Sequence, residues 1–461
     1  MNHQLEDIEV ELLQLITAQQ AHHFGIIPKY QHNGDITFLI EDTADTSTIK
    51  YELEALLGKN ISLEKSPAPL IKKALAKHYR KYEKTNQLSG SDFFEELIKE
   101  AHAIGCSDIH IESYNERCRV RMRLDGKLME RYSIPKSDYP ALVNKIKIRA
   151  MLDIAEKRLP QDGRITLKIL DLDIRVSILP THFGEKVVLR LLSKSAKQVD
   201  LEQLGFQQEQ LAGYLQGIKK TQGLVLISGP TGSGKTTTLY ASLKQLNQKD
   251  VNILTIEDPI EYTLEGINQV QLKEDIGLDF PKALRTFLRQ DPDIVMVGEI
   301  RDAETAQMAI RAALTGHLVL STIHTNSAWG TIARLIDMGI PSFLIADTLN
   351  LSVAQRLLRL LCPECKHKEV FQKEMLPAAF SQVTLSHQYK AVGCSQCHYT
   401  GYKGRKAIYD VLPIDEKLSE SIKDQQWEGK RKNALAESAL KLLMQGKTTF
   451  EEVYPILLHQ E

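Results

Sequence analysis

The chain has 461 residues, and at about 150 residues for a typical domain this length predicts about three domains. Hydrophobic residues make up 43% and charged residues 25% of the sequence, which excludes a protein that is disordered along most of its length. The 58 basic and 59 acidic side chains nearly balance. This balance excludes a uniformly basic nucleic-acid binder, although not a local basic patch.

The sequence also lacks the marks of an exported or membrane-embedded protein. No stretch reaches the roughly 20 consecutive apolar residues of a membrane span. The first residues, 1–6, contain no Lys or Arg and no apolar core, so they do not form a secretory signal. Six cysteines in so long a chain are too few for a disulfide scaffold. We therefore expect a soluble, cytoplasmic protein of several domains.

The beginning of the chain is predicted to be a small α/β module. Residues 36–40 have the composition of a short strand, and 48–57 have helical apolar spacing that stops at Gly58, a common signal for the end of a helix. A second, basic helix is expected over 67–82. The polar, glycine-containing stretch 84–91 is typical of a linker.

A second region begins with a helix expected over 92–104 and continues with alternating strands. In 119–124, three arginines face one side of the strand and three apolar side chains face the other. Asp125 and Gly126 then form a strong hairpin signal. Residues 171–178 alternate in the same way. The pattern predicts an α+β domain.

The third region changes to short, almost continuous apolar runs separated by helical stretches. The runs are 224–228, 253–256, 294–297 and 318–322. Strands buried on both faces of a parallel sheet have this composition. Helices between them complete a parallel α/β sheet, so the fold class is α/β.

The first of these runs leads into a phosphate-binding P-loop. The match is complete and consists of Gly229, Pro230, Thr231, Gly232, Ser233, Gly234, Lys235 and Thr236. The glycines allow the backbone amides to wrap a phosphate, and the following helix presents its positive end. Lys235 is expected to reach the β- and γ-phosphates of ATP, and Thr236 to bind Mg²⁺. Thr237 continues the nucleotide-binding segment.

Acidic side chains follow the second run. Glu257, Asp258 and Glu261 come at the end of the 253–256 strand, which Pro259 terminates. Open α/β sheets place their sites at this edge, so a carboxylate here could orient an attacking water molecule. A solvated acidic loop would have the same composition.

A further acid follows the third run. Glu299 comes after the 294–297 strand, in a pattern typical of a Walker B segment. Gly298 occupies the place where an aspartate is usual. Glu299 therefore serves the metal ion, the water molecule or both, unless the strand simply ends in a charged turn.

Two histidines, His317 and His324, flank the fourth run. In a P-loop domain they are candidates to sense the γ-phosphate. A lone histidine is more often structural than catalytic, but two at the ends of one strand favour the functional interpretation.

Four cysteines form two Cys-x₂-Cys pairs: Cys362, Cys365, Cys394 and Cys397. Such pairs suit tetrahedral Zn²⁺, although the spacer of 28 residues exceeds the usual range. With four protein ligands the zinc would be structural. Redox pairs or separate structural thiols are the alternatives. Cys106 and Cys118 have no such pattern, and we expect both to be buried.

These motifs, in this order, resemble those of the secretion ATPases, the motors of type II secretion and type IV pilus assembly. The resemblance covers roughly residues 90–415 and rests on the P-loop, the segments at 257–261 and 298–302, and the His-containing segment 316–326. It implies a homohexamer of RecA-like ATPase domains that drives assembly of a pilus or pseudopilus. The implied partners are inner-membrane platform and assembly proteins, with the chain peripheral to that membrane and no direct nucleic-acid contact.

The resemblance also implies roles for individual residues. Glu261 is favoured as the general base and Glu299 as the Walker B acid near Mg²⁺, although either could be the base. His317 and His324 match the family's histidine segment. The arginines that the preceding domain is expected to send to the nucleotide phosphates are Arg121, Arg123, Arg164 and Arg175. The cysteine-containing insert is absent from retraction motors, which argues against that subgroup.

The resulting layout has five parts. They are a truncated N-terminal docking module (1–83), an arginine-bearing, PAS-like α+β domain (84–200), a RecA-like ATPase core (201–360), a zinc-binding insert (361–410) and C-terminal helices (411–461). The competing hypotheses are a RecA-like nucleic-acid motor, a pilus-linked DNA-uptake ATPase and a nucleotide-regulated scaffold without turnover. The motifs do not separate type II secretion from pilus assembly.

Overall fold

The computed structural model describes residues 18–32, 35–79, 90–115, 117–193, 199–426 and 434–458, together with positions 8, 12, 15 and 16. The chain divides into two compact units. The first runs to Lys194 and includes the segment Cys394–Tyr399, and the second comprises the rest. None of the described helices combines the length and apolar character needed to span a bilayer.

The beginning of the chain forms a small α/β module, as predicted, although its sheet has three strands where the sequence indicated only the one at 36–40. The strand order is β1-β2-β3, with β1 antiparallel and β3 parallel to β2. Gly58 ends the expected first helix in a left-handed conformation (φ 61°). The elements are α2 (Ala18–Phe24), β1 (Ile26–His32), β2 (Asp35–Glu41), α3 (Thr46–Leu57), β3 (Ile61–Ser66) and α4 (Ala68–His78). Most of the expected linker at 84–91 lies outside the described residues.

The next part of the chain is a six-stranded antiparallel sheet in the order β6-β5-β4-β9-β8-β7. Helices α5 and α6 pack on its apolar face, and the alternation at 119–124 leaves the arginines on the opposite face. Asp125 and Gly126 both have positive φ in the predicted hairpin turn. The elements are α5 (Gly90–Ala103), β4 (Asp108–Ser113), β5 (Cys118–Leu124), β6 (Lys127–Ile134), α6 (Tyr139–Arg149), β7 (Gln161–Leu167), β8 (Leu172–Thr181) and β9 (Gly184–Ser193).

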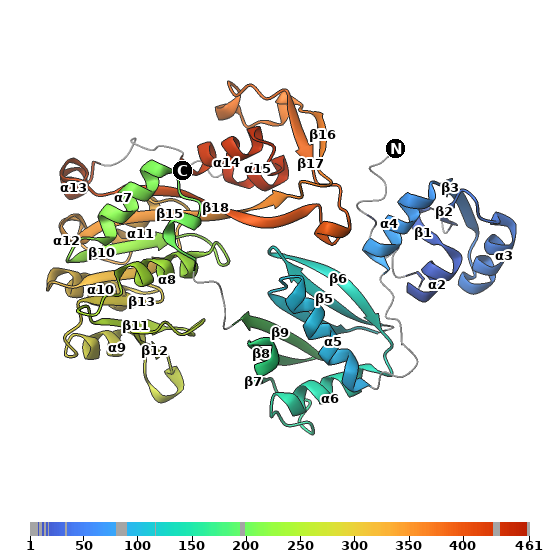
Figure 1. Ribbon diagram of the computed structural model, residues 1–461, viewed down its shortest axis with the longest axis horizontal. Helices are drawn as coiled ribbons and strands as arrows, with labels where there is room; N and C mark the ends of the chain where they lie inside the picture. Colours follow the sequence, from blue (N-terminus) through green and yellow to red (C-terminus); the bar gives the residue numbers. More distant parts are fainter. Residues whose placement is uncertain are drawn as a thin grey trace. The chain divides into compact units, whose positions relative to one another are not determined.

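The second unit contains a seven-stranded sheet, and the four expected buried strands are confirmed within it (Figure 1). The strand order is β12-β11-β13-β14-β10-β15-β18, and every neighbouring pair is parallel except β15 with β18. The strands are β10 (Gly223–Ser228), β11 (Ile253–Glu257), β12 (Asn268–Gln271), β13 (Ile294–Val297), β14 (Leu318–Ile323), β15 (Leu349–Leu361) and β18 (Tyr402–Pro413).

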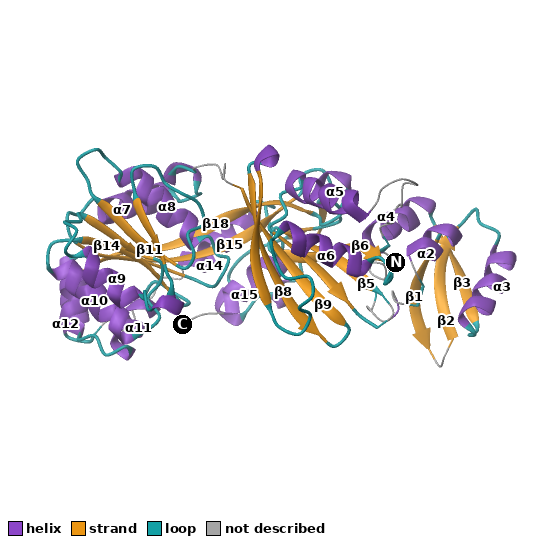
Figure 2. Ribbon diagram, turned by 90° about the horizontal axis from the view of Figure 1, so that it is seen from below, coloured by secondary structure: helices purple, strands orange, loops and turns teal. Residues whose placement is uncertain are grey.

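Helices cover both faces of this sheet, because successive strand residues are apolar on both sides. Leu224 and Leu226 of β10 pack toward one helix layer, whereas Val225 and Ile227 pack toward the other. Figure 2 shows α7 and α8 on one face and α9 to α12 on the opposite face. The helices are α7 (Gln208–Ile218), α8 (Lys235–Leu246), α9 (Phe280–Phe287), α10 (Ala303–Leu314), α11 (Gly330–Asp337) and α12 (Ser342–Thr348).

The end of the chain differs from the expected boundary between insert and helical tail. Strand β18 runs through residue 410 and pairs with β15 along most of its length, so part of the expected insert belongs to the main sheet. The sequence signal was weak because basic and polar residues interrupt the apolar positions in 402–407. The remaining elements are β16 (His367–Val370), β17 (His387–Lys390), α13 (Glu416–Lys423), α14 (Ala434–Met444) and α15 (Phe450–Leu458).

Candidate nucleotide-binding and catalytic site

The P-loop connects the carboxyl end of β10 to the first turn of α8. Gly229, Gly232 and Gly234 have φ values of 147°, 79° and 88°, which side-chain-bearing residues rarely adopt. A Cβ atom at Gly229 would lie 2.5 Å from the carbonyl oxygen of Gln355. Glycine is therefore required here both by the backbone conformation and by the close approach of β15.

The side chains of the loop are arranged for a phosphate group. The Lys235 ammonium spans the loop and donates to the carbonyl oxygens of Gly229 (2.8 Å) and Pro230 (3.2 Å). Ser233 is buried, and its hydroxyl has no hydrogen-bond partner among the described residues. Pro230, Thr231, Gly232, Thr236 and Thr237 are exposed. A phosphate in the loop would provide the acceptor that the Ser233 hydroxyl lacks.

Burial lowers the pKa of Lys235, and nearby Arg356 lowers it further, whereas Glu299 raises it. Two cationic side chains thus lie near each other beside the P-loop. Glu299 compensates part of this positive charge, and a bound polyphosphate would compensate more of it.

Acidic side chains gather at the carboxyl ends of β11 and β13. His324, which follows β14, places its Nε2 atom 3.3 Å from Oε2 of Glu299. Arg301 contacts the other oxygen of Glu299 and lies 3.5 Å from Oδ2 of Asp258. The parallel pairing of these strands brings Glu299, His324 and Asp258 to the same edge of the sheet as the P-loop.

Glu261 and Glu257 have different environments although both follow the same apolar run. Glu261 is half-buried, and its carboxylate makes no hydrogen bond or ion pair with any described residue. Glu257 is buried and accepts hydrogen bonds from Tyr240, Thr255 and Gln269. Of the two, Glu261 is the carboxylate available to a water molecule.

His317 is not brought to this edge. It precedes β14, and its Nδ1 atom lies 2.9 Å from the carbonyl oxygen of Ala312 and 3.2 Å from the Thr315 hydroxyl. The six residues of β14 separate it from His324, a distance of about 20 Å along an extended strand. The two histidines therefore belong to opposite ends of the sheet.

Two residues of β15 adjoin the P-loop and were not anticipated. Gln355 is buried and accepts a hydrogen bond from Thr238 of α8 (2.9 Å). Arg356 donates to the carbonyl oxygens of Gln355 (3.0 Å) and Asn326 (2.7 Å). Both stand out as polar residues within the apolar strand 349–361, a signal that the sequence contained.

The arginines of the first unit lie on the polar face of the six-stranded sheet. Arg121 is held by Glu112 through two hydrogen bonds of 2.7 and 2.9 Å. Glu112 also accepts from Arg119 (2.9 Å) and pairs with Lys186 (3.2 Å). Arg121 would have to exchange this carboxylate for a phosphate in order to bind a nucleotide.

The other expected arginines form a row across neighbouring strands. In the sheet register, Arg164 is opposite Arg175, Arg175 is opposite Arg190, Arg190 is opposite Asp108, and Asp108 is opposite Arg123. Asp108 pairs with both Arg190 (3.0 Å) and Arg123 (3.3 Å). Arg190 was missed, although it is a charged residue within the apolar run of β9.

Like charges directly opposite each other destabilise a sheet. The arginine row, defined as Arg164, Arg175, Arg190 and Arg123, places two pairs of arginines directly opposite each other, and Asp108 lies between Arg190 and Arg123. It is therefore a surface that an anion would stabilise.

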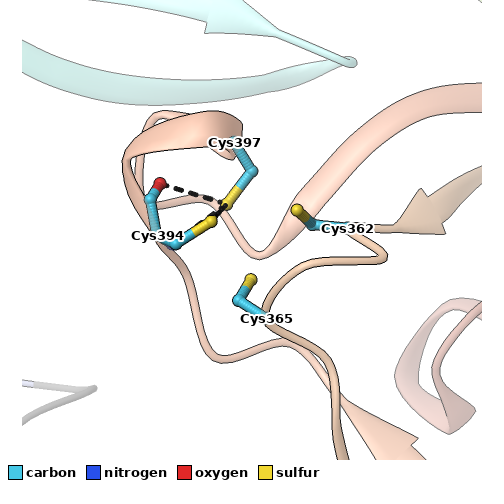
Figure 3. Close-up of side chains that lie close together, drawn as sticks. All are labelled: Cys362, Cys365, Cys394 and Cys397. Atoms are coloured by element: carbon cyan, nitrogen blue, oxygen red, sulfur yellow. Dashed lines mark hydrogen bonds between the residues drawn. The ribbon is translucent and has the colours of Figure 1, made fainter.

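The four cysteines of the two Cys-x₂-Cys pairs converge, and their thiols point toward one another (Figure 3). Their sulfur atoms all lie within 4.8 Å of one another, and those of Cys394 and Cys397 are 3.8 Å apart. Tetrahedral Zn²⁺ with Zn–S bonds of about 2.3 Å separates its sulfurs by about 3.8 Å. The cluster is compatible with a metal site, whereas Cys106 and Cys118 are buried elsewhere, as expected.

Residues 84–455 match the protein-family model described as type II/IV secretion system protein. The chain belongs to this family. It is 41% identical to the type IV pilus assembly ATPase PilB of Myxococcus xanthus, over 97% of this chain and 87% of that protein. It is 46% identical to the type II secretion system protein E of Pseudomonas aeruginosa, over 77% of this chain and 73% of that protein. The resemblance is confirmed, and the chain is a secretion or pilus assembly ATPase.

Two solved structures have a similar fold. The pilus retraction motor PilT with bound ADP aligns with a TM-score of 0.54 and 27% identity, over 78% of this chain and 96% of that one. The ATPase DotB of Legionella pneumophila aligns with a TM-score of 0.61 and 20% identity, over 82% of this chain and 98% of that one. The latter similarity concerns the fold alone.

The ion pairs of Glu112 predict a pH-dependent stability. Burial alone would raise the pKa of Glu112, but hydrogen bonds from Arg121, Arg119 and Lys186 outweigh it and lower the pKa to about 2. The folded pKa is below the unfolded one, so the stabilisation is present above about pH 4.5 and is lost as the pH falls toward 2. Glu112→Gln should therefore destabilise the chain by about 3 kcal/mol at neutral pH.

Urea unfolding at a series of pH values checks this expectation. The difference between wild type and Glu112→Gln should shrink steadily in acid. Glu95→Gln, which removes a partly exposed ion pair with Arg149, is the control and should change stability by less than about 1 kcal/mol at any pH. A Glu112→Gln variant as stable as this control at neutral pH would contradict the prediction.

Proposed function

We propose that the chain is a Mg²⁺-dependent, RecA-like ATPase whose hydrolysis of ATP drives assembly of a pilus or pseudopilus. The observation that carries this proposal is the meeting of the P-loop with Glu261, Glu299 and His324 at one edge of a parallel sheet. Phosphate-binding amides, an available carboxylate and a metal-binding acid are the parts that phosphoryl transfer to water requires.

Each residue has a role that follows from its environment. Lys235 would leave the loop carbonyls and bind the β- and γ-phosphates, with the Ser233 hydroxyl donating to the same group. Thr236 and Glu299 would hold Mg²⁺, which neutralises charge on the phosphates when bound. Glu261 would accept a proton from the attacking water, because its carboxylate is not engaged by other side chains. His324 would orient Glu299.

The arginine-bearing part, for which we propose a PAS-like fold, would supply cations to a nucleotide held by the ATPase core of another subunit in a hexamer. Support comes from the arginine row, whose repulsion a polyphosphate would relieve. Arg190 joins Arg123, Arg164 and Arg175 in this proposed role. The pairing with Glu112 makes Arg121 a weaker candidate. His317, at the far end of β14, would act only indirectly.

We extend the same proposal to the partners and to the five-part layout, with the insert ending before β18. The N-terminal module would dock to an inner-membrane platform or assembly protein of the machine, as its position before the arginine-bearing part suggests. Both pilus assembly and type II secretion relatives match at 41–46% identity, so the motor elements suit either machine. Isolation of the membrane protein that binds the full chain, followed by its identification, would distinguish pilus assembly from type II secretion.

The four clustered cysteines would bind a structural zinc ion. Four thiolates close the coordination sphere, so the ion would stabilise the insert between β15 and β18 and take no part in hydrolysis.

Two substitutions test the proposed ATPase mechanism. Lys235→Ala should weaken ATP binding by at least about tenfold, because it removes the cation that contacts the phosphates. Glu261→Gln should bind ATP normally but lower kcat by about 10²-fold or more, because an amide cannot accept the proton. Steady-state hydrolysis and fluorescent-nucleotide binding measure both, and a wild-type rate in Glu261→Gln would show that Glu261 is not the base.

Mixing of variant subunits tests the role of the arginine row. Arg190→Ala should lower kcat by about 10²-fold, whereas Arg158→Ala, at a highly exposed arginine of the same unit, should not change it. Hexamers mixed from Arg190→Ala and Glu261→Gln subunits should regain part of the activity, because an intact base meets an intact arginine at those interfaces where the two kinds of subunit adjoin in the right order. No recovery of activity on mixing, or full activity in a monomer, would contradict the proposal that Arg190 acts in the active site of a neighbouring subunit.

Elemental analysis of the purified chain tests the zinc site. We expect about one zinc ion for each chain, lost in Cys362→Ser together with several degrees of thermal stability. Cys106→Ser, at a cysteine outside the cluster, is the control and should retain the ion. Folded wild-type protein without zinc would refute the assignment.

A further inference from the structure

The carboxylate of Glu257 is buried at the end of β11, with 3% of its surface exposed. It accepts hydrogen bonds from the Tyr240 hydroxyl, from Thr255 Oγ1 (2.6 Å) and from Gln269 Nε2 (3.0 Å). Among the described residues no basic side chain forms an ion pair with it. Burial of a carboxylate that is held only by neutral donors costs free energy, so its presence here points to a functional role.

Tyr240 connects this carboxylate to the segment that bears Glu261. The phenol donates to Glu257, and its oxygen accepts the backbone N–H of Glu261 (3.3 Å). Its ring packs edge-on against Tyr262, with the ring centroids 4.6 Å apart. Tyr240 belongs to α8, the helix that begins at Lys235. One side chain thus spans from the phosphate-binding helix to the proposed base.

Gln269 of β12 holds the same segment at two more points. Its Oε1 accepts the backbone N–H of Leu264 (2.6 Å), and its Nε2 donates to the carbonyl oxygen of Tyr262 (3.2 Å). Nε2 also lies 3.4 Å from the Tyr240 hydroxyl. The backbone of 261–264 is therefore fixed by side chains that all converge on Glu257.

The direction of these hydrogen bonds depends on the charge of Glu257. A phenol has one proton, and an ionised carboxylate can only accept. With that proton directed to Glu257, the phenol oxygen must present lone pairs to the N–H of Glu261. The amide of a glutamine at position 257 could instead donate a hydrogen bond to the phenol oxygen. The phenol proton would then turn toward the backbone N–H of Glu261, and the two hydrogens would repel each other.

We propose that Tyr240 is a positioning residue for ATP hydrolysis, oriented by Glu257 so that its oxygen holds the backbone of Glu261 at a set place relative to the P-loop helix. The inference rests on the proposed role of Glu261 as the general base. It explains why the buried acid and the available acid occur together: the first orients the phenol, and the phenol positions the second. A small displacement of a base from its water molecule is enough to reduce turnover strongly.

Tyr240→Phe removes the hydroxyl and retains the ring that packs on Tyr262. We expect kcat to fall by at least about tenfold and KM for ATP to stay within about twofold, because the P-loop is unchanged. Hydrogen exchange should become faster in the backbone amides of 258–264. Glu257→Gln is the second variant, expected to act in the same direction and available should Tyr240→Phe fail to fold.

Tyr214→Phe is the matched control. Tyr214 of α7 is fully buried, and its hydroxyl bonds to Ser242 of α8 (2.6 Å). Among the described residues this hydroxyl makes no hydrogen bond to the 258–264 segment. Both variants thus lose one buried hydroxyl beside the same helix. Tyr214→Phe should keep the wild-type kcat and the wild-type exchange in 258–264. An equal loss of kcat in both variants would overturn the proposal, because it would show a general effect on α8.

A double variant separates this inference from the base assignment. If Tyr240 acts through Glu261, Tyr240→Phe should cause no further loss of kcat in a Glu261→Gln background, and independent multiplication of the two losses would overturn the inference. A wild-type rate in Glu261→Gln would refute the base assignment alone. Hydrogen exchange of the backbone amides in 258–264 would then test whether Tyr240 positions this segment. Exchange that stays at the wild-type rate in Tyr240→Phe would overturn the proposed positioning.

Discussion

The parallel pairing of β10 with both β14 and β15 is the constraint on which the functional half of the chain depends. Parallel strands end at the same edge of a sheet, so the segments that follow them are gathered there whatever their separation in sequence. The P-loop after β10, Glu299 after β13 and His324 after β14 meet for this reason. His317 comes before β14, and the same constraint places it at the opposite edge.

The site shows how neighbouring residues of one type acquire different tasks. Glu257 and Glu261 are four positions apart, but one ends a buried strand and the other lies beyond Pro259 in a half-buried segment. Burial with three donors makes Glu257 a fixed acceptor, whereas the Glu261 carboxylate has no hydrogen-bond or ion-pair partner among the described residues. The arginines are paired differently, since Arg121 shares Glu112 with Arg119 and Lys186, whereas Arg190 and Arg123 share Asp108.

Local patterns predicted a large part of this architecture. The continuous apolar runs, the P-loop and the alternating arginine strand each depend on side chains close together in sequence, and all were found at the expected places. The contributions of Gln355, Arg356 and Arg190 were missed because each acts through a cross-strand or loop neighbour far away in sequence. Strand β18 was missed because its pairing with β15, and not its own composition, makes it part of the sheet.

The sequence by itself determined the family, the phosphate-binding loop, the cysteine pairs and the set of candidate acids, because those depend on residue type and short spacing. Only the tertiary structure decided which candidates share an edge, which carboxylate is available, and which arginines pair with Glu112 or Asp108. These properties depend on strand order, register and burial, and they arise only when distant segments pack together. The hydrogen-bonded link from Glu257 through Tyr240 to Glu261 is of this second kind, since it joins a strand, a helix and a loop.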